Sequence, residues 1–235
     1  MQEPESLYTP CELFIYSMTR HKLRQFEEIA QMPHVFEMKK EMKGHWKEYF
    51  GNANPIIVEL ACGKGDYTVG MARLFPDKNF IGMDIKGNRI WRGAKTVEEE
   101  KISNAAFLRG QIEDLLEYFD TSELSEIWIT FPDPHLPLGK ARKRLTSPRF
   151  LAMYAALLPK NGILHLKTDS RPLFDYSLET IHEHLWSQLE KIEDLYQTEH
   201  ITRPIFQIQT YYELMHLKDN RKIYYCAWQK PEVTI

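Results

Sequence analysis

The stretch PIIVELACGKGDYTVGMARLF, residues 55–75, changes its pattern in the middle. Its first half is a short, apolar, β-branched run, which is typical of a strand buried on both faces of a parallel sheet. The run stops at Gly63 and Gly65, and the residues after them place apolar side chains at helical spacing. A buried strand that turns through glycines into a helix is the first unit of an α/β fold.

The same alternation continues along the rest of the chain. After the strand at 56–62, it predicts strands near residues 79–85, 105–109, 126–131, 162–167, 191–197 and 222–229, with helices over 87–101, 147–158 and 172–189. We therefore predict an α/β fold with a mostly parallel, seven-stranded sheet and helices on both faces. Residues 1–50 mix charge with apolar residues at helical intervals, so we predict an N-terminal helical arm (1–50) before a single domain (51–235).

Composition excludes several classes of protein. With 43% hydrophobic and 27% charged residues in 235, the chain reads as an ordinary globular protein. No apolar run approaches the roughly 20 residues of a membrane span, so we predict a cytoplasmic protein without membrane contact. The three cysteines, Cys11, Cys62 and Cys226, are scattered and form no metal-binding pattern, so we predict neither disulfides nor a metal site.

The positive charges are unevenly distributed. The net charge is −3, yet the segment from Pro137 to Arg149 carries Lys140, Arg142, Lys143 and Arg144 with no acid among them. A second, more diluted cationic region covers residues 19–47. Such a run is suited to the phosphates of a nucleic acid, although a solvated loop is the commoner meaning of a charged run.

Polar residues stand at the ends of the first three predicted strands, where ligands bind in such sheets. Glu59 is an acid in an apolar strand and needs a partner, for which a ligand ammonium group is suited. Asp84 follows the glycines by about 20 residues, where a carboxylate can accept both hydroxyls of a ribose. Gln111 could meet an adenine edge through its amide. An amino acid, a ribose and an adenine are the parts of S-adenosylmethionine, which we predict as the cofactor. NAD fits less well, because a dinucleotide fingerprint would need a third glycine where Thr68 stands.

The fourth strand delivers Asp133 between Pro132 and Pro134. The prolines fix φ on either side and donate no backbone hydrogen bonds, so the chain itself aims the carboxylate. The fifth strand ends at Asp169, which the usual strand order places next to Asp133. Guanine presents N1–H and N2–H donors that carboxylates accept, whereas adenine presents an acceptor at N1. The pair of acids therefore favours guanine as the substrate base.

Longer motifs carry a specific resemblance. FPDP, a cationic loop ending in KRLTSPRFL, LHLKTDSRPLFDYSL and TYYE together resemble the bacterial tRNA (guanine-N7)-methyltransferase family. The resemblance runs from about Pro55 to the C-terminus. It implies a Rossmann-like class I methyltransferase fold and an enzyme that forms 7-methylguanosine in the variable loop of tRNA.

The resemblance also implies roles for individual residues. Contacts to S-adenosylmethionine are implied at Glu59, Asp84, Gln111 and Asp133, beside the glycine turn of Gly63 and Gly65. Asp133 is implied as the catalytic residue. Contacts to the RNA are implied at Asp169 and at Thr210, Tyr211, Tyr212 and Glu213, and a further one at Lys140.

The chain departs from the family pattern in three places. Ala61 stands for the first glycine, Gln111 for a frequent aspartate, and HLPLG (135–139) for a tryptophan followed by lysine-rich sequence. A substrate-contacting lysine of relatives falls at Pro137, so we expect its contact to be lost or moved to Lys140. We expect these changes to affect substrate binding and tRNA preference more than cofactor binding.

Two alternatives stay open at this point. An adenine N6 methyltransferase also places Asp-Pro after the fourth strand, but it needs a further proline and an aromatic residue where His135 and Leu136 stand. A catalytically altered paralogue that binds tRNA without turnover is the other. The sequence leaves open whether the protein is a monomer or a homodimer.

Overall fold

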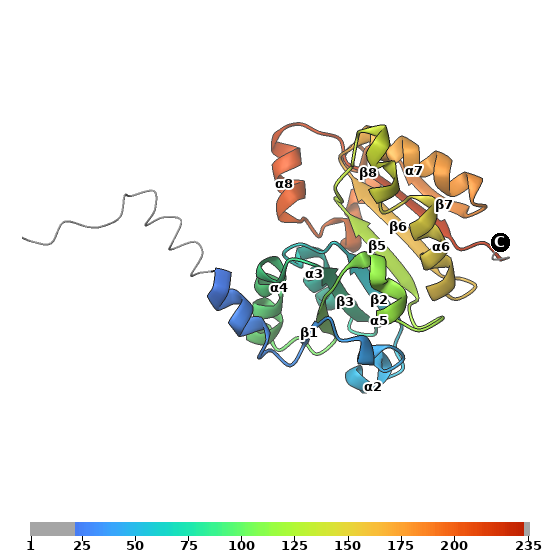
Figure 1. Ribbon diagram of the computed structural model, residues 1–235. Coiled ribbons are helices and arrows are strands. Elements are labelled where there is room, and N and C mark those ends of the chain that lie inside the picture. Colours follow the sequence, from blue (N-terminus) through green and yellow to red (C-terminus); the bar gives the residue numbers. More distant parts are fainter. Residues whose placement is uncertain (1–21, 233–235) are drawn as a thin grey trace, which may run out of the picture.

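The computed structural model describes residues 22–232 and shows an α/β fold around one sheet (Figure 1). The strands are β1 (Val35–Glu37), β2 (Ile56–Leu60), β3 (Asn79–Asp84), β4 (Ala105–Arg109), β5 (Glu126–Thr130), β6 (Ile163–Thr168), β7 (Ser187–Ile192) and β8 (Tyr224–Gln229). The helices after residue 30 are α2 (Trp46–Phe50), α3 (Asp66–Leu74), α4 (Gly87–Glu100), α5 (Leu115–Tyr118), α6 (Pro148–Leu157), α7 (Arg171–Glu183) and α8 (Tyr211–Lys218). Short 3-10 turns include η3 (Leu138–Lys143) and η6 (Pro204–Phe206). The prediction of an α/β fold is confirmed.

The sheet has eight strands rather than the predicted seven, in the order β1-β4-β3-β2-β5-β6-β8-β7. The additional strand is β1, which comes from the predicted arm and pairs parallel with β4. Three residues are too few to show the alternation of apolar and polar residues that predicts a strand. The segment is a strand because its backbone pairs with that of β4. The rest of the predicted arm up to residue 21 lies outside the described residues.

Only the last strand breaks the parallel pattern. β8 lies between β6 and β7 and is antiparallel to both. Residues 172–189 were predicted as one helix, but α7 ends at Glu183, Leu185 adopts a left-handed φ of 63°, and the chain enters β7 at Ser187. The predicted strand at 191–197 is thus shifted towards the N-terminus, because a bulky residue with positive φ ends the helix.

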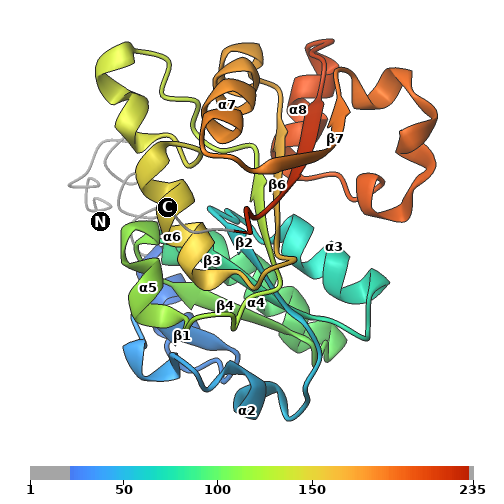
Figure 2. The same cartoon turned by 90° about the vertical axis from the view of Figure 1, so that its right-hand side faces the viewer.

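Two apolar cores fill the two faces of the sheet. Alternate residues of β2 separate them: Ile56, Val58 and Leu60 join the core beneath α5, α6 and α7, whereas Ile57 joins the core beneath α3 and α4. Figure 2 shows α5 and α6 on one side of the sheet and α3 and α4 on the other. The prediction of helices on both faces is confirmed.

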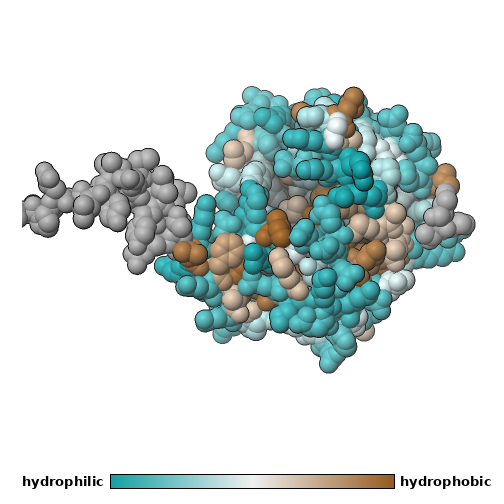
Figure 3. Space-filling view, in the orientation of Figure 1, coloured by the Kyte–Doolittle hydropathy of each residue, from teal (hydrophilic) through white to brown (hydrophobic). Residues whose placement is uncertain are grey.

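The face drawn in Figure 3 is largely hydrophilic, with separate small apolar patches. Across residues 22–232 we find no helix long and apolar enough to cross a bilayer.

Candidate active site at the carboxyl ends of the strands

A cleft of about 730 Å³ opens where β2, β3, β5 and β6 end. Among the predicted site residues, those that line it are Gly63, Asp84, Asp133, Asp169, Thr210 and Tyr212. A smaller pocket of about 250 Å³ adjoins the cleft, sharing Ala61, Asp84 and Ile85 with it, and contains Gln111. The topology therefore brings together residues from positions 61 to 221 of the chain.

Five predicted residues line neither the cleft nor the adjoining pocket. They are Glu59, Gly65, Lys140, Tyr211 and Glu213. Gly65 and Glu59 lie in the turn and the strand that precede α3, and Glu213 is buried.

The glycine turn after β2 has a left-handed backbone at three positions. Ala61, Gly63 and Gly65 have φ values of 56°, 57° and 73°. A Cβ on Gly65 would lie 2.5 Å from Cε1 of Phe107, so no larger residue fits there. A Cβ on Gly63 would meet only the ring of Tyr212, at 3.9 Å, so the Gly63 backbone is open towards the cleft. Ala61 holds the conformation for which glycine is the usual residue, and the departure from the family pattern stores local strain.

Asp84 is held by the backbone around it. Its Oδ2 accepts from the N–H of Gly63 at 3.0 Å, and its Oδ1 accepts from the N–H of Lys86 at 2.8 Å. The side chain is 6% exposed and lines both the cleft and the pocket. A carboxylate oriented in this way still has lone pairs for two hydroxyl donors.

Glu59 finds its partners within the protein. Its Oε2 accepts from both the backbone N–H and the hydroxyl of Thr68, and its Oε1 accepts from the hydroxyl of Thr130. The Thr68 N–H belongs to the first turn of α3, where donors have no partner within the helix. Burial raises the pKa of Glu59 to about 7, against the opposing effect of these hydrogen bonds. A ligand ammonium group is therefore not needed to explain this acid, and its binding there stays a prediction.

Asp133 is the exposed acid of the cleft. It lies in the segment after β5 and has no hydrogen bond or ion pair with any residue from 22 to 232. The backbone on both sides is strained, because Phe131 and His135 have φ values of 48° and 43°. The chain thus holds an unpartnered carboxylate in the cleft at a cost in backbone conformation.

Asp169 lies in the same cleft but has partners. Its Oδ2 is 2.8 Å from Nη1 of Arg221 and 3.5 Å from Nδ1 of His216. β5 and β6 are adjacent and parallel, as the prediction required for Asp133 and Asp169 to share an edge. Arg221 competes with any substrate donor for this carboxylate.

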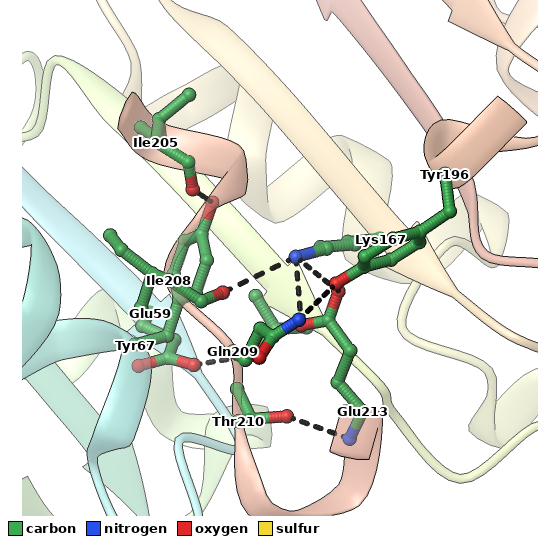
Figure 4. Close-up of polar contacts among 10 residues, drawn as sticks. Glu59, Tyr67, Lys167, Tyr196, Ile205, Ile208, Gln209, Thr210 and Glu213 are labelled. Carbon is green, nitrogen blue, oxygen red and sulfur yellow. Dashed lines mark hydrogen bonds and ion pairs between the residues drawn. The ribbon is translucent and has the colours of Figure 1, made fainter. Parts of the chain in front are cut away.

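The segment TYYE begins α8 and is fixed from both sides. Thr210 is the N-cap, and its hydroxyl accepts from the N–H of Glu213 at 3.1 Å. The Glu213 carboxylate turns inward to the ammonium of Lys167 at 2.7 Å and accepts from the hydroxyl of Tyr196 at 2.9 Å (Figure 4). Lys167 and Glu213 are both fully buried, so the polar atoms of this pair face each other and not the cleft.

The two tyrosines of this segment differ in position. The backbone N–H of Tyr211 donates to Asp66 at 3.0 Å, and the ammonium of Lys64 lies 3.7 Å from the Tyr211 ring centroid. Tyr211 therefore ties α8 to the glycine turn. Tyr212 is 36% exposed and lines the cleft, so it is the side chain of the two that can meet a ligand there.

The predicted role of the cationic loop is wrong for one residue, Arg144. We expected the whole run from Lys140 to Arg144 to hold RNA phosphates, but Arg144 is only 6% exposed. Its guanidinium donates to the carbonyl oxygens of His135 and Leu136 at 3.2 Å and stacks 4.2 Å from the Tyr176 ring centroid. Arg144 thus braces the preceding loop, which leaves Lys140, Arg142 and Lys143 exposed to solvent.

Sequence reasoning missed Lys167. A lysine within the apolar strand LHLKT is a signal of a buried charge, and such a charge needs an acid partner. Its partner Glu213 is 46 residues away, and only the fold shows that the two meet. Among residues 22–232, no group of three or more His, Cys, Asp or Glu side chains is arranged to hold a metal ion.

The site fits the parts of S-adenosylmethionine. The open Gly63 backbone and the oriented Asp84 suit an amino acid and a ribose, and the adjoining pocket with Gln111 suits a flat base. A Cβ at Gly65 would collide with Phe107, so the turn keeps its shape through its glycines. The residues that would hold the cofactor are thus Gly63, Asp84 and Gln111 directly, with Gly65 shaping the turn.

Comparisons with known proteins agree with this fold. Residues 53–226 match a family model described as "Putative methyltransferase". The chain is 46% identical over 221 residues to a tRNA (guanine-N(7)-)-methyltransferase of Christiangramia forsetii, a match that covers 90% of this chain and 98% of that one. It is 45% identical to a protein of the same name from Bacteroides fragilis over 92% of this chain and 88% of that one.

Solved structures show the fold. A 16S rRNA methyltransferase, KamB, aligns with a TM-score of 0.62 at 14% identity and covers 80% of this chain and 93% of that one. An antibiotic-related methyltransferase aligns with a TM-score of 0.58 at 16% identity over 79% and 92% of the two chains. The extent of the family match and the identity to its relatives lead to one conclusion: this chain belongs to the bacterial tRNA (guanine-N7)-methyltransferase family.

Proposed function

We propose that this protein transfers a methyl group from S-adenosylmethionine to N7 of a guanine in the variable loop of tRNA, forming 7-methylguanosine. Its relatives are named tRNA (guanine-N(7)-)-methyltransferase, and the position in the variable loop is what the sequence resemblance implies. The single observation that carries the proposal is the unpartnered carboxylate of Asp133, held on a strained backbone in a cleft that also contains Asp84 and the glycine turn.

The chemistry requires little proton transfer. S-adenosylmethionine, when bound, supplies an electrophilic methyl group on a positively charged sulfur. N7 of guanine already has a free lone pair, so no general base has to remove a proton first. The chain has to align the base and stabilise the positive charge that the purine gains. Asp133 is suited to both tasks, because its carboxylate is negative, exposed to the cleft and free of competing partners.

Other residues would hold the substrate. Asp169 is the acid that can accept from N1–H and N2–H of guanine, once Arg221 has moved to a phosphate or to solvent. Thr210 and Glu213 would contribute by fixing α8, and Tyr212 is placed to touch the base. Lys140, Arg142 and Lys143 are exposed cations that would bind phosphates without reading sequence. A substrate of this kind is met in the cytoplasm, which remains the proposed location.

The test uses the purified protein with labelled S-adenosylmethionine and two tRNA transcripts. One transcript is unmodified, and the matched control carries 7-deazaguanosine at the variable-loop position and so lacks the N7 atom. We expect transfer to the first transcript alone, with 7-methylguanosine identified by mass spectrometry of the digested RNA. Methyl groups on an adenine amino group would assign the adenine N6 alternative. Binding of tRNA with no transfer would assign the altered paralogue.

A further inference from the structure

The loop of residues 135–139, which we call the HLPLG loop, presents two apolar side chains to solvent. Leu136 is 55% exposed and Leu138 is 87% exposed. Burying a leucine side chain contributes about 1.5–3 kcal/mol of favourable free energy. The free protein does not gain this free energy at its two exposed leucines. An apolar partner would recover it.

The HLPLG loop is held in a fixed shape. Buried Arg144 donates to the carbonyl oxygens of His135 and Leu136, and its guanidinium stacks on Tyr176 of α7. The N–H of Lys140 donates to the carbonyl oxygen of Pro137 at 2.8 Å and closes the following turn. The two leucines therefore stand on a braced protrusion, so that little backbone conformational entropy remains to be lost when their side chains bind.

The position of the loop indicates the partner. Leu136 lines the same cleft as Asp133, so the apolar protrusion forms part of the mouth of the site. Towards the C-terminus the loop runs into η3, which begins at Leu138 and carries the exposed cations Lys140, Arg142 and Lys143, none of which pairs with an acid in the described chain. An apolar tip between a base-binding cleft and unpaired cations is complementary to an RNA strand, which offers base faces next to phosphates.

We propose that Leu136 and Leu138 form an apolar wedge that enters the base stack of the tRNA beside the target guanine. Enzymes that modify a base within a stack have to turn it out, at a cost of a few kcal/mol. The leucines take the space that the guanine leaves, and Lys140, Arg142 and Lys143 hold the neighbouring phosphates. The inference rests on the proposed function, since it needs a stacked guanine as the substrate.

The first experiment compares two substrates with one double variant. L136A/L138A is assayed on folded tRNA and on an unstructured oligoribonucleotide that contains the same guanine. We expect kcat/KM on folded tRNA to fall about tenfold or more, mainly in kcat, because unstacking loses its support, which corresponds to about 1.4 kcal/mol or more. The rate on the oligoribonucleotide stays within about twofold of the wild type, because its guanine needs no unstacking. The control is L189A, which removes a leucine of similar exposure (51%) from β7.

The second experiment observes the base directly. A tRNA that carries 2-aminopurine next to the target guanine should brighten when the wild-type protein binds and brighten much less with L136A/L138A. This measurement also tests whether the leucines enter the base stack if the oligoribonucleotide is too short to be a substrate of the wild type.

Three results would overturn the wedge. They are unchanged kinetics on folded tRNA, an equal loss on both substrates, and equal fluorescence changes for wild type and variant. A shift of the double variant from dimer to monomer in ultracentrifugation, with unchanged kinetics, would assign the leucines to contact between two copies. Failure of the proposed function looks different, because the wild type would then methylate neither RNA at N7.

Discussion

The ammonium of Lys167 lies 2.7 Å from the carboxylate of Glu213, and both side chains are 0% exposed. Lys167 comes from β6 and Glu213 from the first turn of α8, so the pair joins the helix that flanks the cleft to the sheet. Burial lowers the pKa of Lys167, and the nearby Glu213 opposes that shift. The Glu213 carboxylate therefore favours the charged form of Lys167 in a place that solvent does not reach.

Breaking this pair should destabilise the protein strongly. K167M leaves the Glu213 carboxylate buried without its main partner, and we expect a loss of about 3–5 kcal/mol in the free energy of unfolding, measured by urea denaturation. K167M/E213L replaces both charges by apolar groups and should recover most of that loss. The matched control is K160M, since Lys160 and Glu232 form a 3.0 Å pair with side chains 71% and 78% exposed. A loss of less than about 1 kcal/mol in K167M would show that the pair does not anchor α8.

Removing the Asp133 carboxylate should abolish turnover but leave the cofactor site intact. We expect D133A and D133N to lower kcat about 100-fold or more, because a preorganised charge no longer faces the purine as it becomes positive. Calorimetry with S-adenosylhomocysteine should still detect binding, since Asp84 and the glycine turn are untouched although one implied cofactor contact is lost. D77A removes an exposed acid elsewhere on the surface and serves as the control. Near-normal turnover by D133N would refute the role of the charge.

Glu59 should make stability depend on pH. Its pKa is raised from 4.5 to about 7 by burial, so between these values the folded state binds more protons than the unfolded state. Stability from this group is therefore full below pH 4.5 and is lost as the pH rises towards about 7. Urea denaturation at a series of pH values from 4.5 to 8 should show a steeper decline for the wild type than for E59Q. Parallel curves for the two proteins would contradict this prediction.

The strain at Ala61 should be removable. A non-glycine residue with a φ of 56° costs about 1–2 kcal/mol, and glycine costs about 0.5–1 kcal/mol in chain entropy, so A61G should stabilise the fold by about 0.5–1 kcal/mol. G65A is the opposite case, because its Cβ would lie 2.5 Å from Phe107, and it should destabilise by about 2 kcal/mol. G139A serves as the control, since nothing lies within 4 Å of a Cβ there. Destabilisation by A61G in thermal melting would mean that the Ala61 methyl group packs favourably enough to outweigh the strain.

The sequence predicted the strands and the longer helices between residues 56 and 168, because each strand there is apolar and bounded by glycine, proline or charge, but it missed the short helix α5. β1 was missed, since VFE is short and half-buried and is defined by the backbone of β4. Residue type and position led us to expect Asp84 and Asp133 at strand ends of one site, and both line the cleft, while their roles there stay predictions. The role of Arg144 could not be predicted, because its partners are two backbone carbonyl oxygens of a loop. Every residue has such a carbonyl, so the sequence does not show which ones accept a hydrogen bond.

The place of β8 in the sheet determines at which stage of synthesis the sheet can be completed. This strand, Tyr224–Gln229, pairs with both β6 and β7, and within the described sheet β7 has no other neighbour. A ribosome-bound chain that has emerged only as far as α8 therefore holds β7 without a pairing partner. We expect the native sheet to close only after the last strand has left the ribosome, so that the nascent chain acquires its activity late and all at once.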